Sequence, residues 1–370
     1  MREGWTYKKL GEVCTSITDG SHNPPKGIEH SEYRMISSQN VFDDDLRIDD
    51  ETVRFLTEED HYKEDKRTKL SKDVVLLTIV GTIGRACVLK GTEGFITLQR
   101  SVSALHPSSE IHPRFLMHSL IGNRERLNQE AHGIAQRGIY LRQLSELEIP
   151  IPLLSEQQSI VAELDKINEL ISLKKAQLSD LDNLAQSIFC DMFGDPIENE
   201  KGWEVKKLGE ACSLKAGKSI KASDLVEKKD NIFPCYGGNG IRGYIDRFSH
   251  EMDLPIIGRQ GALCGNVNFA KGPFYATEHA VVVTPVVNLD VVWLYYILKG
   301  LRLENYAHGV AQPGISVGDL NPIPLPIPPL PLQQEFAKRI ELIEQQKAQI
   351  NSTIKDLETL LASRMQHWFD

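Results

Sequence analysis

The sequence of 370 residues predicts two globular domains in tandem, each followed by a long helix, with the two helices paired as an antiparallel coiled coil. Three observations lead to this fold. An internal repeat covers both halves, a heptad pattern closes each half, and a proline-spaced connector precedes each heptad stretch. Two copies are too few for a solenoid, which needs three or more repeats, so a tandem pseudo-dimer fits the pattern better.

The internal repeat has fixed ends and a divergent middle. Residues 4–14 return as 202–212 with eight of eleven positions identical, as Gly-Trp-x-x-Lys-Lys-Leu-Gly-Glu-x-Cys. Residues 131–139 return as 307–315, as Ala-His-Gly-x-Ala-Gln-x-Gly-Ile, and the interior of the first copy is about 22 residues longer. A weaker echo in the middle aligns Gly81-x-x-Gly84-x-x-Cys87 with Gly258-x-x-Gly261-x-x-Cys264.

Long helices are predicted over 155–194 and 331–370. Their mainly apolar seam advances in steps of four and three, from Ile160 to Met192 and again from Phe336 to Trp368, which is the spacing of a coiled coil. Ser155 with Gln158 three residues on predicts a capping box at the first start. The alternative is that each helix packs only on its own domain. The uninterrupted length favours mutual pairing, and the return of the chain makes that pairing antiparallel.

Each long helix follows an extended connector, at 149–153 and at 321–331, in which prolines alternate with apolar residues. Proline fixes φ and lacks a backbone donor, so the connector is predicted to be an edge strand or a polyproline segment. Pro326-x-x-Pro329 also matches an SH3-type ligand, but its equivalence to the shorter copy favours a structural strut.

Composition excludes several classes of protein. The net charge is −9, of which 154–200 alone carries −7. The other segments carry −3 over 1–153, +2 over 201–329 and −1 over 330–370, so a local basic face is still possible. Six cysteines without a C-x-x-C pair predict reduced thiols rather than a disulfide framework. The sequence shows no secretion signal and no run of 18 apolar residues, so the predicted location is cytoplasmic.

Two motifs that suggest enzymes are better explained otherwise. Residues 23–26, Asn-Pro-Pro-Lys, match an amino-methyltransferase motif except that Lys26 replaces the aromatic residue that stacks on a flipped base. Residues 238–243 match G-x-G-x-x-G, but the flanking residues predict a turn between strands rather than a dinucleotide site. The sequence therefore predicts no catalytic, cofactor-binding or metal-binding residues.

Polar and basic side chains beside glycine-rich turns favour a binding protein. Arg and Gln pair with base edges, and lysines contact phosphate, although any single Arg is more often a solvated surface charge. The predicted DNA-binding residues are Ser21, His22, Lys26, Arg34, Gln39, Thr82, Arg85, Gln99, Arg100, Lys218, Lys221, Asn239, Arg242, Arg259, Gln260 and His279.

The repeated motifs, the Ile-Pro-Ile-Pro-x-Leu-x-x-Gln-Gln junction and Met-Phe-Gly-Asp-Pro at 192–196 resemble the specificity subunit of type I restriction-modification systems. The resemblance implies two target-recognition domains of α/β (α+β) class, at 1–153 and 201–330. It also implies spacer segments at 154–200 and 331–370. Each domain would read one half of a bipartite asymmetric DNA site, and the coiled coil would set the spacing and dock the modification subunits.

The resemblance also implies the partners. The subunit itself is non-catalytic and holds no cofactor. Two modification subunits would supply methylation from S-adenosylmethionine, and restriction subunits would supply cleavage driven by ATP with Mg. Two alternatives remain: a coiled-coil scaffold that joins two proteins without binding DNA, and the recognition part of a fused restriction-methyltransferase. The start and end of the chain at repeat boundaries disfavour the fusion.

Overall fold

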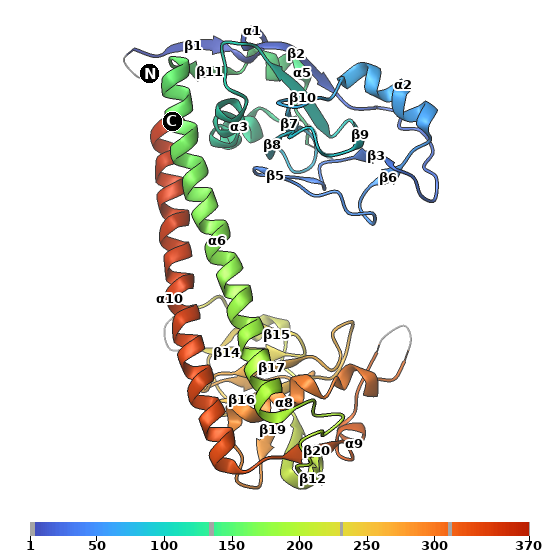
Figure 1. The fold of residues 1–370 in the computed structure, drawn as a ribbon, viewed down its shortest axis with the longest axis vertical. Helices are drawn as coiled ribbons and strands as arrows, with labels where there is room; N and C mark the ends of the chain where they lie inside the picture. Colours follow the sequence, from blue (N-terminus) through green and yellow to red (C-terminus); the bar gives the residue numbers. More distant parts are fainter. Residues whose placement is uncertain (1–3, 133–136, 230–231, 310–312, 370) are drawn as a thin grey trace. The chain divides into compact units, whose positions relative to one another are not determined.

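The computed structural model describes residues 4–132, 137–229, 232–309 and 313–369 (Figure 1). They form two compact units: unit 1 is Met1–Leu173 with Thr353–Asp370, and unit 2 is Lys174–Ser352. Each unit contains one predicted globular domain and part of both long helices. The segments 133–136 and 310–312 of the repeated Ala-His-Gly motif lie outside the described residues.

Unit 1 is built on a four-stranded antiparallel sheet in the order β2-β10-β7-β8. A second sheet has the order β6-β3-β9, in which β3 and β9 are parallel. The strands are β2 (Cys14–Asp19), β10 (Val102–Pro107), β7 (Val75–Thr78), β8 (Ala86–Val88), β6 (Arg54–Phe55), β3 (Tyr33–Ile36), β9 (Phe95–Leu98) and the hairpin β4 (Val41–Phe42) with β5 (Asp45–Leu46). The short helices are α1 (Leu10–Val13), α2 (Glu58–Thr68), α3 (Pro113–Gly122), α4 (Arg124–Glu130) and α5 (Leu141–Glu146).

Unit 2 repeats this plan with fewer elements. Its main sheet has the order β13-β19-β16-β17, and a smaller sheet has the order β15-β14-β18. The strands are β13 (Cys212–Ala216), β19 (Ala280–Pro285), β16 (Leu254–Gly258), β17 (Val267–Ala270), β15 (Gly240–Ile245), β14 (Phe233–Gly237) and β18 (Tyr275–Ala276). The helical segments are α7 (Leu208–Ala211), η1 (Ala222–Asp224), α8 (Val291–Gly300), η2 (Leu303–Tyr306) and α9 (Val317–Leu320). The described part of unit 2 has no counterpart of α2 or of the β4–β5 hairpin, in line with its shorter interior.

The predicted alignment of the two glycine-rich turns is wrong by three residues. Ile79 and Arg259 occupy the same position, because their carbonyls accept hydrogen bonds from Ile139 and Ile315 of the repeated motif, both at 2.9 Å. Gly81 therefore matches Gly261, not Gly258. Both have positive φ, at 82° and 93°, a conformation that favours glycine. The equal glycine spacing suggested the wrong alignment, because the structurally matching spacings differ. The next glycine of positive φ after Gly81 is Gly84, three residues later, and after Gly261 it is Gly265, four residues later.

The proline connectors form edge strands, as one of the two alternatives predicted. β11 (Glu148–Ile151) pairs antiparallel with β1 (Thr6–Lys9), and β20 (Pro324–Ile327) pairs in the same way with β12 (Glu204–Lys207). A two-stranded sheet has only edges, so a proline without an N–H can take part in it. Pro326 lies inside β20, which supports the structural role of this segment.

The long helices α6 (Leu154–Phe193) and α10 (Leu330–Phe369) begin one residue earlier than predicted. Ser155 therefore lies inside the first turn, and the predicted capping box is wrong. A buried glutamine fastens the start instead: the Gln157 side chain accepts from the backbone N–H of His112 at 2.8 Å and donates to Pro152 O and Glu110 O at 3.0 Å. Gln333 does the same for α10, accepting from Asp290 N and donating to Pro328 O. The repeated Gln-Gln pair thus has a structural role in both copies.

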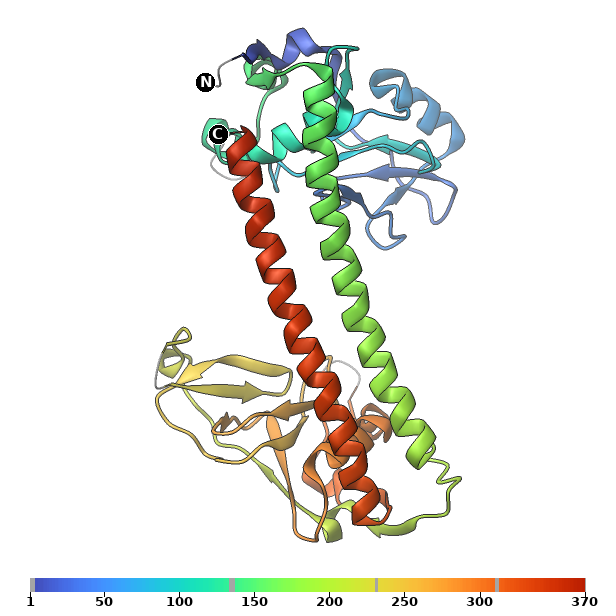
Figure 2. The ribbon, with the colours of Figure 1, turned by 60° about the vertical axis from the view of Figure 1, so that its left-hand side comes forward.

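Segments of α6 and α10 lie side by side within each unit (Figures 1 and 2). In unit 1, Arg364 donates to Glu163 at 2.9 Å, and in unit 2 Lys347 Nζ lies 2.8 Å from an oxygen of Asp182. Apolar residues of both helices join one core in each unit, Ile160 and Leu164 with Leu361 in unit 1 and Phe189 with Phe336 in unit 2. Glu163 precedes Asp182 along α6, whereas their partners Arg364 and Lys347 follow the opposite order along α10. This order confirms the antiparallel coiled coil.

An ion network in unit 1 joins α3, α6 and the β4–β5 hairpin. Arg114 on α3 donates to both carboxylate oxygens of Asp44, at 2.8 and 2.7 Å, and to both of Asp165 on α6, at 2.6 and 2.7 Å. His118 lies 2.9 Å from the same Asp165 carboxylate. Burial would raise the pKa of Asp165, but hydrogen bonds from His118 and Arg114 outweigh it and hold the pKa at about 2.

Replacing Asp165 by Asn is expected to lower the free energy of unfolding of unit 1 by about 2 kcal/mol near neutral pH. The carboxyl has a lower pKa in the folded state, so its stabilisation is present above its ordinary pKa of 3.8 and is lost as pH falls through about 2. Denaturant unfolding measured at several pH values should therefore show the difference shrinking below pH 3.8. Glu169→Gln, which removes an exposed partner of Lys166, is the matched control. A difference independent of pH would contradict this account.

Candidate nucleic-acid interface

Two loops meet at one end of the main sheet of unit 1. The chain leaving β2 makes backbone hydrogen bonds from Gly20 to Val102 and from Ser21 to Leu98, and Arg100 N returns one to Ser21 O at 3.0 Å. A Cβ at Gly20 would lie 2.1 Å from Leu98 O, so this crossing requires glycine. Gly217 makes the same crossing in unit 2, where a Cβ would lie 2.0 Å from Ala276 O. The repeat therefore holds the same backbone frame in both units.

In unit 1, a buried carboxylate contacts an arginine and a histidine at this crossing. The Asp19 side chain is 9% exposed, and it pairs with Arg67 of α2 and lies 2.6 Å from His22 Nε2. Arg67 Nε also donates to Asp19 O at 2.9 Å. An open cavity of about 520 Å³ lies here, lined by Asp19, His22, Arg67, Ile79, Val80, Arg100, His132, Gly138, Ile139, Tyr140 and Leu141. Its basic and aromatic groups suit contacts with phosphates and bases.

The structure brings together only some of the predicted residues of unit 1. Ser21, His22, Gln99 and Arg100 meet at the crossing, where Ser21 is buried and bridges to Gln99. Thr82 and Gln39 are both exposed. Their turns are neighbours, because Ser38 Oγ would lie 3.7 Å from a Cβ at Gly81 and Ser38 N donates to Ser101 Oγ at 3.0 Å.

The other predicted residues of unit 1 have separate surroundings. Arg85 lies over the Phe42 ring at 4.9 Å, and Arg34 lies 3.7 Å from Asp50. Lys26 is exposed on the chain between β2 and β3. None of these three lines the cavity at the crossing.

Unit 2 uses different side chains on the same frame. Arg259 N donates to His279 O at 3.1 Å, and the turn at Gly238 and Asn239 lies against both, since a Cβ at Gly238 would be 3.0 Å from His279 O. Arg259 is half-buried, and its Nε has no hydrogen-bond partner among the described residues. Gln260 is exposed and bridges to Gly314.

The remaining predicted residues of unit 2 lie on neighbouring segments. Lys218 N donates to Ala276 O beside the crossing at Gly217. Lys221 is exposed before η1, and Arg242 packs over Gly237 from β15. The 238–243 motif spans the β14–β15 turn, as its flanking residues predicted.

Sequence reasoning missed three groups of the unit 1 cavity, Arg67, His132 and Tyr140. His132 belongs to the repeated motif, and Tyr140, which is 70% exposed, follows it directly, so the repeat itself was a usable signal. Arg67 gave no such signal, because its partner Asp19 lies 48 residues away in the chain.

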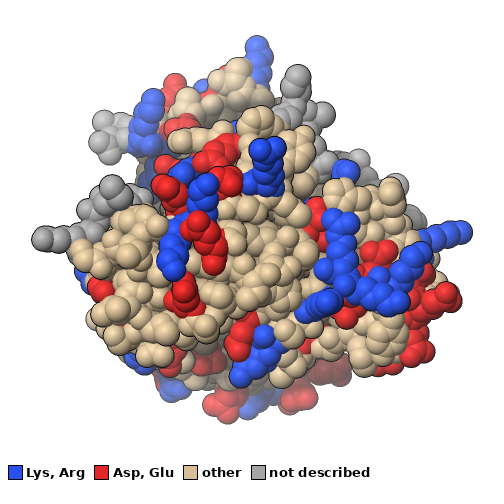
Figure 3. All heavy atoms as spheres, turned by 90° about the horizontal axis from the view of Figure 1, so that it is seen from above, with Lys and Arg blue, Asp and Glu red and all other residues tan. Residues whose placement is uncertain are grey.

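The surface charge of the face shown in Figure 3 is mixed. Lys and Arg there are interspersed with Asp and Glu rather than gathered in one basic patch.

No group of three or more His, Cys, Asp or Glu side chains in the described residues is arranged to hold a metal ion. The six cysteines are free thiols, and burial raises the pKa of Cys14, Cys87 and Cys212 to about 12. No helix within the described ranges has the length and apolarity needed to cross a membrane.

Comparison with known proteins gives one consistent family. The family described as "Type I restriction modification DNA specificity domain" matches residues 2–183 and again 200–359. The specificity subunit of the type I restriction enzyme EcoprrI of Escherichia coli is 46% identical over 138 residues, 37% of this chain and 34% of that protein. The MjaIX specificity subunit of Methanocaldococcus jannaschii is 26% identical over 238 residues, 54% of each chain. The matched stretches thus span about a third to a half of these relatives.

A solved structure agrees over the whole fold. The S subunit of a type I restriction-modification system from M. genitalium superposes with a TM-score of 0.58 at 19% identity, covering 99% of this chain and 96% of that one. The family match covers most of the chain in two copies, and the duplicated α/β units with paired long helices are the fold that the resemblance implied. The chain belongs to the specificity subunits of type I restriction-modification systems.

Proposed function

We propose that this chain is the DNA-reading subunit of a type I restriction-modification complex, and that each unit reads one half of a bipartite, asymmetric site. The paired helices set the spacing of the halves and dock two modification subunits. Methylation with S-adenosylmethionine, and cleavage with ATP and Mg, belong to partner subunits in this proposal, and the chain itself carries no catalytic residue.

One observation carries the proposal: the two units present different side chains on one repeated backbone frame. Where unit 1 has Ile79 and Val80, unit 2 has Arg259 and Gln260 at the positions that bond the repeated motif. Unit 1 instead places its basic groups on the Asp19 cluster and at Arg100. The two units thus have the same backbone arrangement but different hydrogen-bond donors and acceptors, which suits two domains that recognise different base sequences. A scaffold that binds no DNA gives no reason for this difference at equivalent loops.

The test is selection of duplexes from a random DNA pool by the full chain and by two variants. Arg100→Ala is expected to relax the preference in one half-site, and Arg259→Ala in the other, each by about 10- to 100-fold if the guanidinium contacts a base. Arg339→Ala, at an exposed residue of α10 that does not line the cavity, is the matched control. Selection of no sequence by the wild-type chain would favour the scaffold, and loss of both half-sites in one variant would reject separate readers.

A further inference from the structure

Helix α2 of unit 1 carries a basic strip formed by Lys63, Lys66 and Arg67. In the last two turns of this helix every exposed charged side chain is basic, because Glu64 and Asp65 are half-buried. Residues three and four apart are neighbours on a helix, so Lys63 lies beside both other members of the strip. Neither lysine makes an ion pair or a hydrogen bond to a described residue. Both ammonium groups are therefore free to meet an anionic partner.

The dipole of α2 explains only part of this arrangement. Acidic residues occupy the first turn of the helix, and Lys66 and Arg67 occupy the last. Cations stabilise a helix at its carboxyl end, but this effect falls off within the last turn. Lys63 lies one turn earlier, so the dipole gives no reason for its charge or for the exposure of three basic side chains on one face.

Arg67 places the end of the basic strip at the crossing of unit 1. Its Nε donates to Asp19 O at 2.9 Å, and its guanidinium pairs with the Asp19 carboxylate. The Arg67 side chain is nevertheless 49% exposed and lines the cavity of about 520 Å³. Lys63 stands four residues earlier, about 6 Å further along the helix axis. The strip therefore continues the cationic surface of the candidate interface beyond its cavity.

The described part of unit 2 lacks both the helix and its anchor. The backbone makes the same crossing at Gly217, but Ala216 precedes this glycine, whereas Asp19 precedes Gly20 in unit 1. No described helix of unit 2 corresponds to α2. An arginine on such a helix would also find no carboxylate at Ala216. The basic strip thus belongs to unit 1 and has no described equivalent in unit 2.

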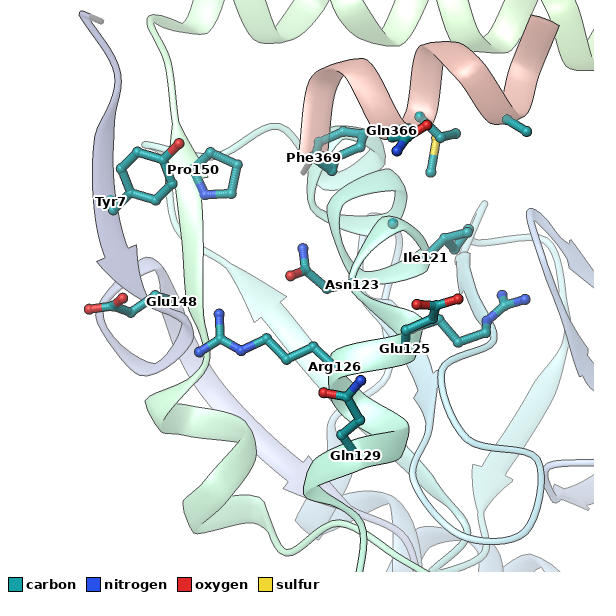
Figure 4. A pocket seen from close by; sticks show the side chains of 14 residues that line it. Tyr7, Ile121, Asn123, Glu125, Arg126, Gln129, Glu148, Pro150, Gln366 and Phe369 are labelled. Atoms are coloured by element: carbon teal, nitrogen blue, oxygen red, sulfur yellow. The ribbon is translucent and has the colours of Figure 1, made fainter. Parts of the chain in front are cut away.

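A larger cavity of unit 1 is less suited to a polyanion. This cavity of about 880 Å³ lies beside the end of α10, and its lining includes Glu125 and Glu148 as well as Arg126 (Figure 4). Arg126 is also paired with Glu130, at 3.3 Å. A phosphate backbone would meet carboxylates there together with the cation, which the basic strip avoids.

We propose that the basic strip binds the phosphate backbone of the DNA whose half-site unit 1 reads. This inference rests on the proposed function and deepens it, because it assigns Lys63 and Lys66 to contacts that carry no sequence information. A lysine ammonium is a compact charge on a flexible stem, which suits phosphates better than base edges. Unit 1 thereby gains affinity on α2 that is independent of sequence.

The test measures the dissociation constant of the full chain for two labelled duplexes at several NaCl concentrations, by anisotropy. One duplex has the sequence that the wild-type chain selects from a random pool, and the other has an unrelated sequence of equal length. In the double variant Lys63→Gln, Lys66→Gln, the plot of log association constant against log salt is expected to be less steep by about 1.8, because each lost phosphate contact removes about 0.9. The ratio of variant to wild-type Kd should therefore fall about tenfold between about 50 and about 200 mM NaCl, equally for both duplexes.

The matched control is Lys338→Gln with Lys355→Gln, which removes two exposed charges from α10 and should keep the wild-type slope. Thermal midpoints near that of the wild-type chain exclude loss of folding as the cause. An unchanged slope in the α2 variant, with sequence selection by the wild-type chain intact, overturns the inference and leaves the proposed function standing. A loss confined to the selected duplex overturns it too, because the lysines would then read bases. If the wild-type chain binds no DNA, the proposed function fails and this inference fails with it.

Discussion

Four residues inserted into each long helix are expected to lengthen the non-specific gap of the DNA target by about one or two base pairs, with both half-sites unchanged. The insertions stand between Leu173 and Lys174 in α6 and between Ser352 and Thr353 in α10, where the two units divide. Four residues add about 6 Å of helix, which is nearly two base-pair rises of about 3.4 Å. Placing them at this division leaves the packing inside each unit intact. Selection from a random duplex pool measures the gap.

Two controls make this result interpretable. The same insertion in α6 alone shifts the seam of one helix against the other, so the chain is expected to lose thermal stability rather than acquire a longer gap. Four residues inserted between Lys228 and Lys229, in an exposed segment of unit 2, should leave the gap unchanged. A doubly inserted chain that binds DNA with the original gap would show that the helices do not measure the site. DNA recognition itself would stand.

Replacing residues 13–130 by residues 211–306 of the same chain is expected to convert the asymmetric target into an inverted repeat of the half-site read by unit 2. Both segments begin and end at matching positions of the internal repeat, so the paired helices and ribbons remain. Arg114 leaves with the exchanged segment and would strand the partly buried Asp165, so Asp165→Ala accompanies the exchange. The same selection from a random pool gives the target.

The reverse exchange, with 13–130 placed in unit 2, is the matched control and should give the other inverted repeat. If the two hybrids selected the same sequence, or if either retained the asymmetric target, reading of one half-site by one unit would be wrong. Thermal unfolding of both hybrids separates this result from loss of folding.

The long helices and their pairing were predictable because a heptad pattern is local and the internal repeat doubles the signal. The connectors were predictable as extended segments, since proline restricts φ wherever it stands. The capping box failed because the buried Gln157 contacts backbone groups of residues 110 and 112, which no local pattern reveals. The turn alignment failed because one extra residue displaced the second glycine.

The candidate site was predictable only in part. Arg, Gln and His beside glycine turns were predicted to lie together, and the structure does place Gln99 with Arg100, and Arg259 with Gln260, at turns beside the main sheets. Arg67 was missed because a helix surface carries many charges, and only its contact with the buried Asp19 sets it apart. Arg85 was included because it follows a glycine turn, yet its guanidinium lies over Phe42. Long-range pairing decided both cases.

The glutamine fastening has a consequence for how such a chain can acquire new specificity. Gln157 bonds backbone atoms of His112 and Glu110, and Gln333 bonds the backbone N–H of Asp290, so neither depends on the side chains at those positions. A foreign segment recombined between the repeated borders can therefore make the same backbone hydrogen bonds to the glutamine, whatever its side chains. The Arg114–Asp165 pair behaves in the opposite way, because it accepts only a segment that brings the matching cation. In the described part of unit 2, Val292 stands at the matching position of α8, so a segment recombined there does not need to bring such a cation.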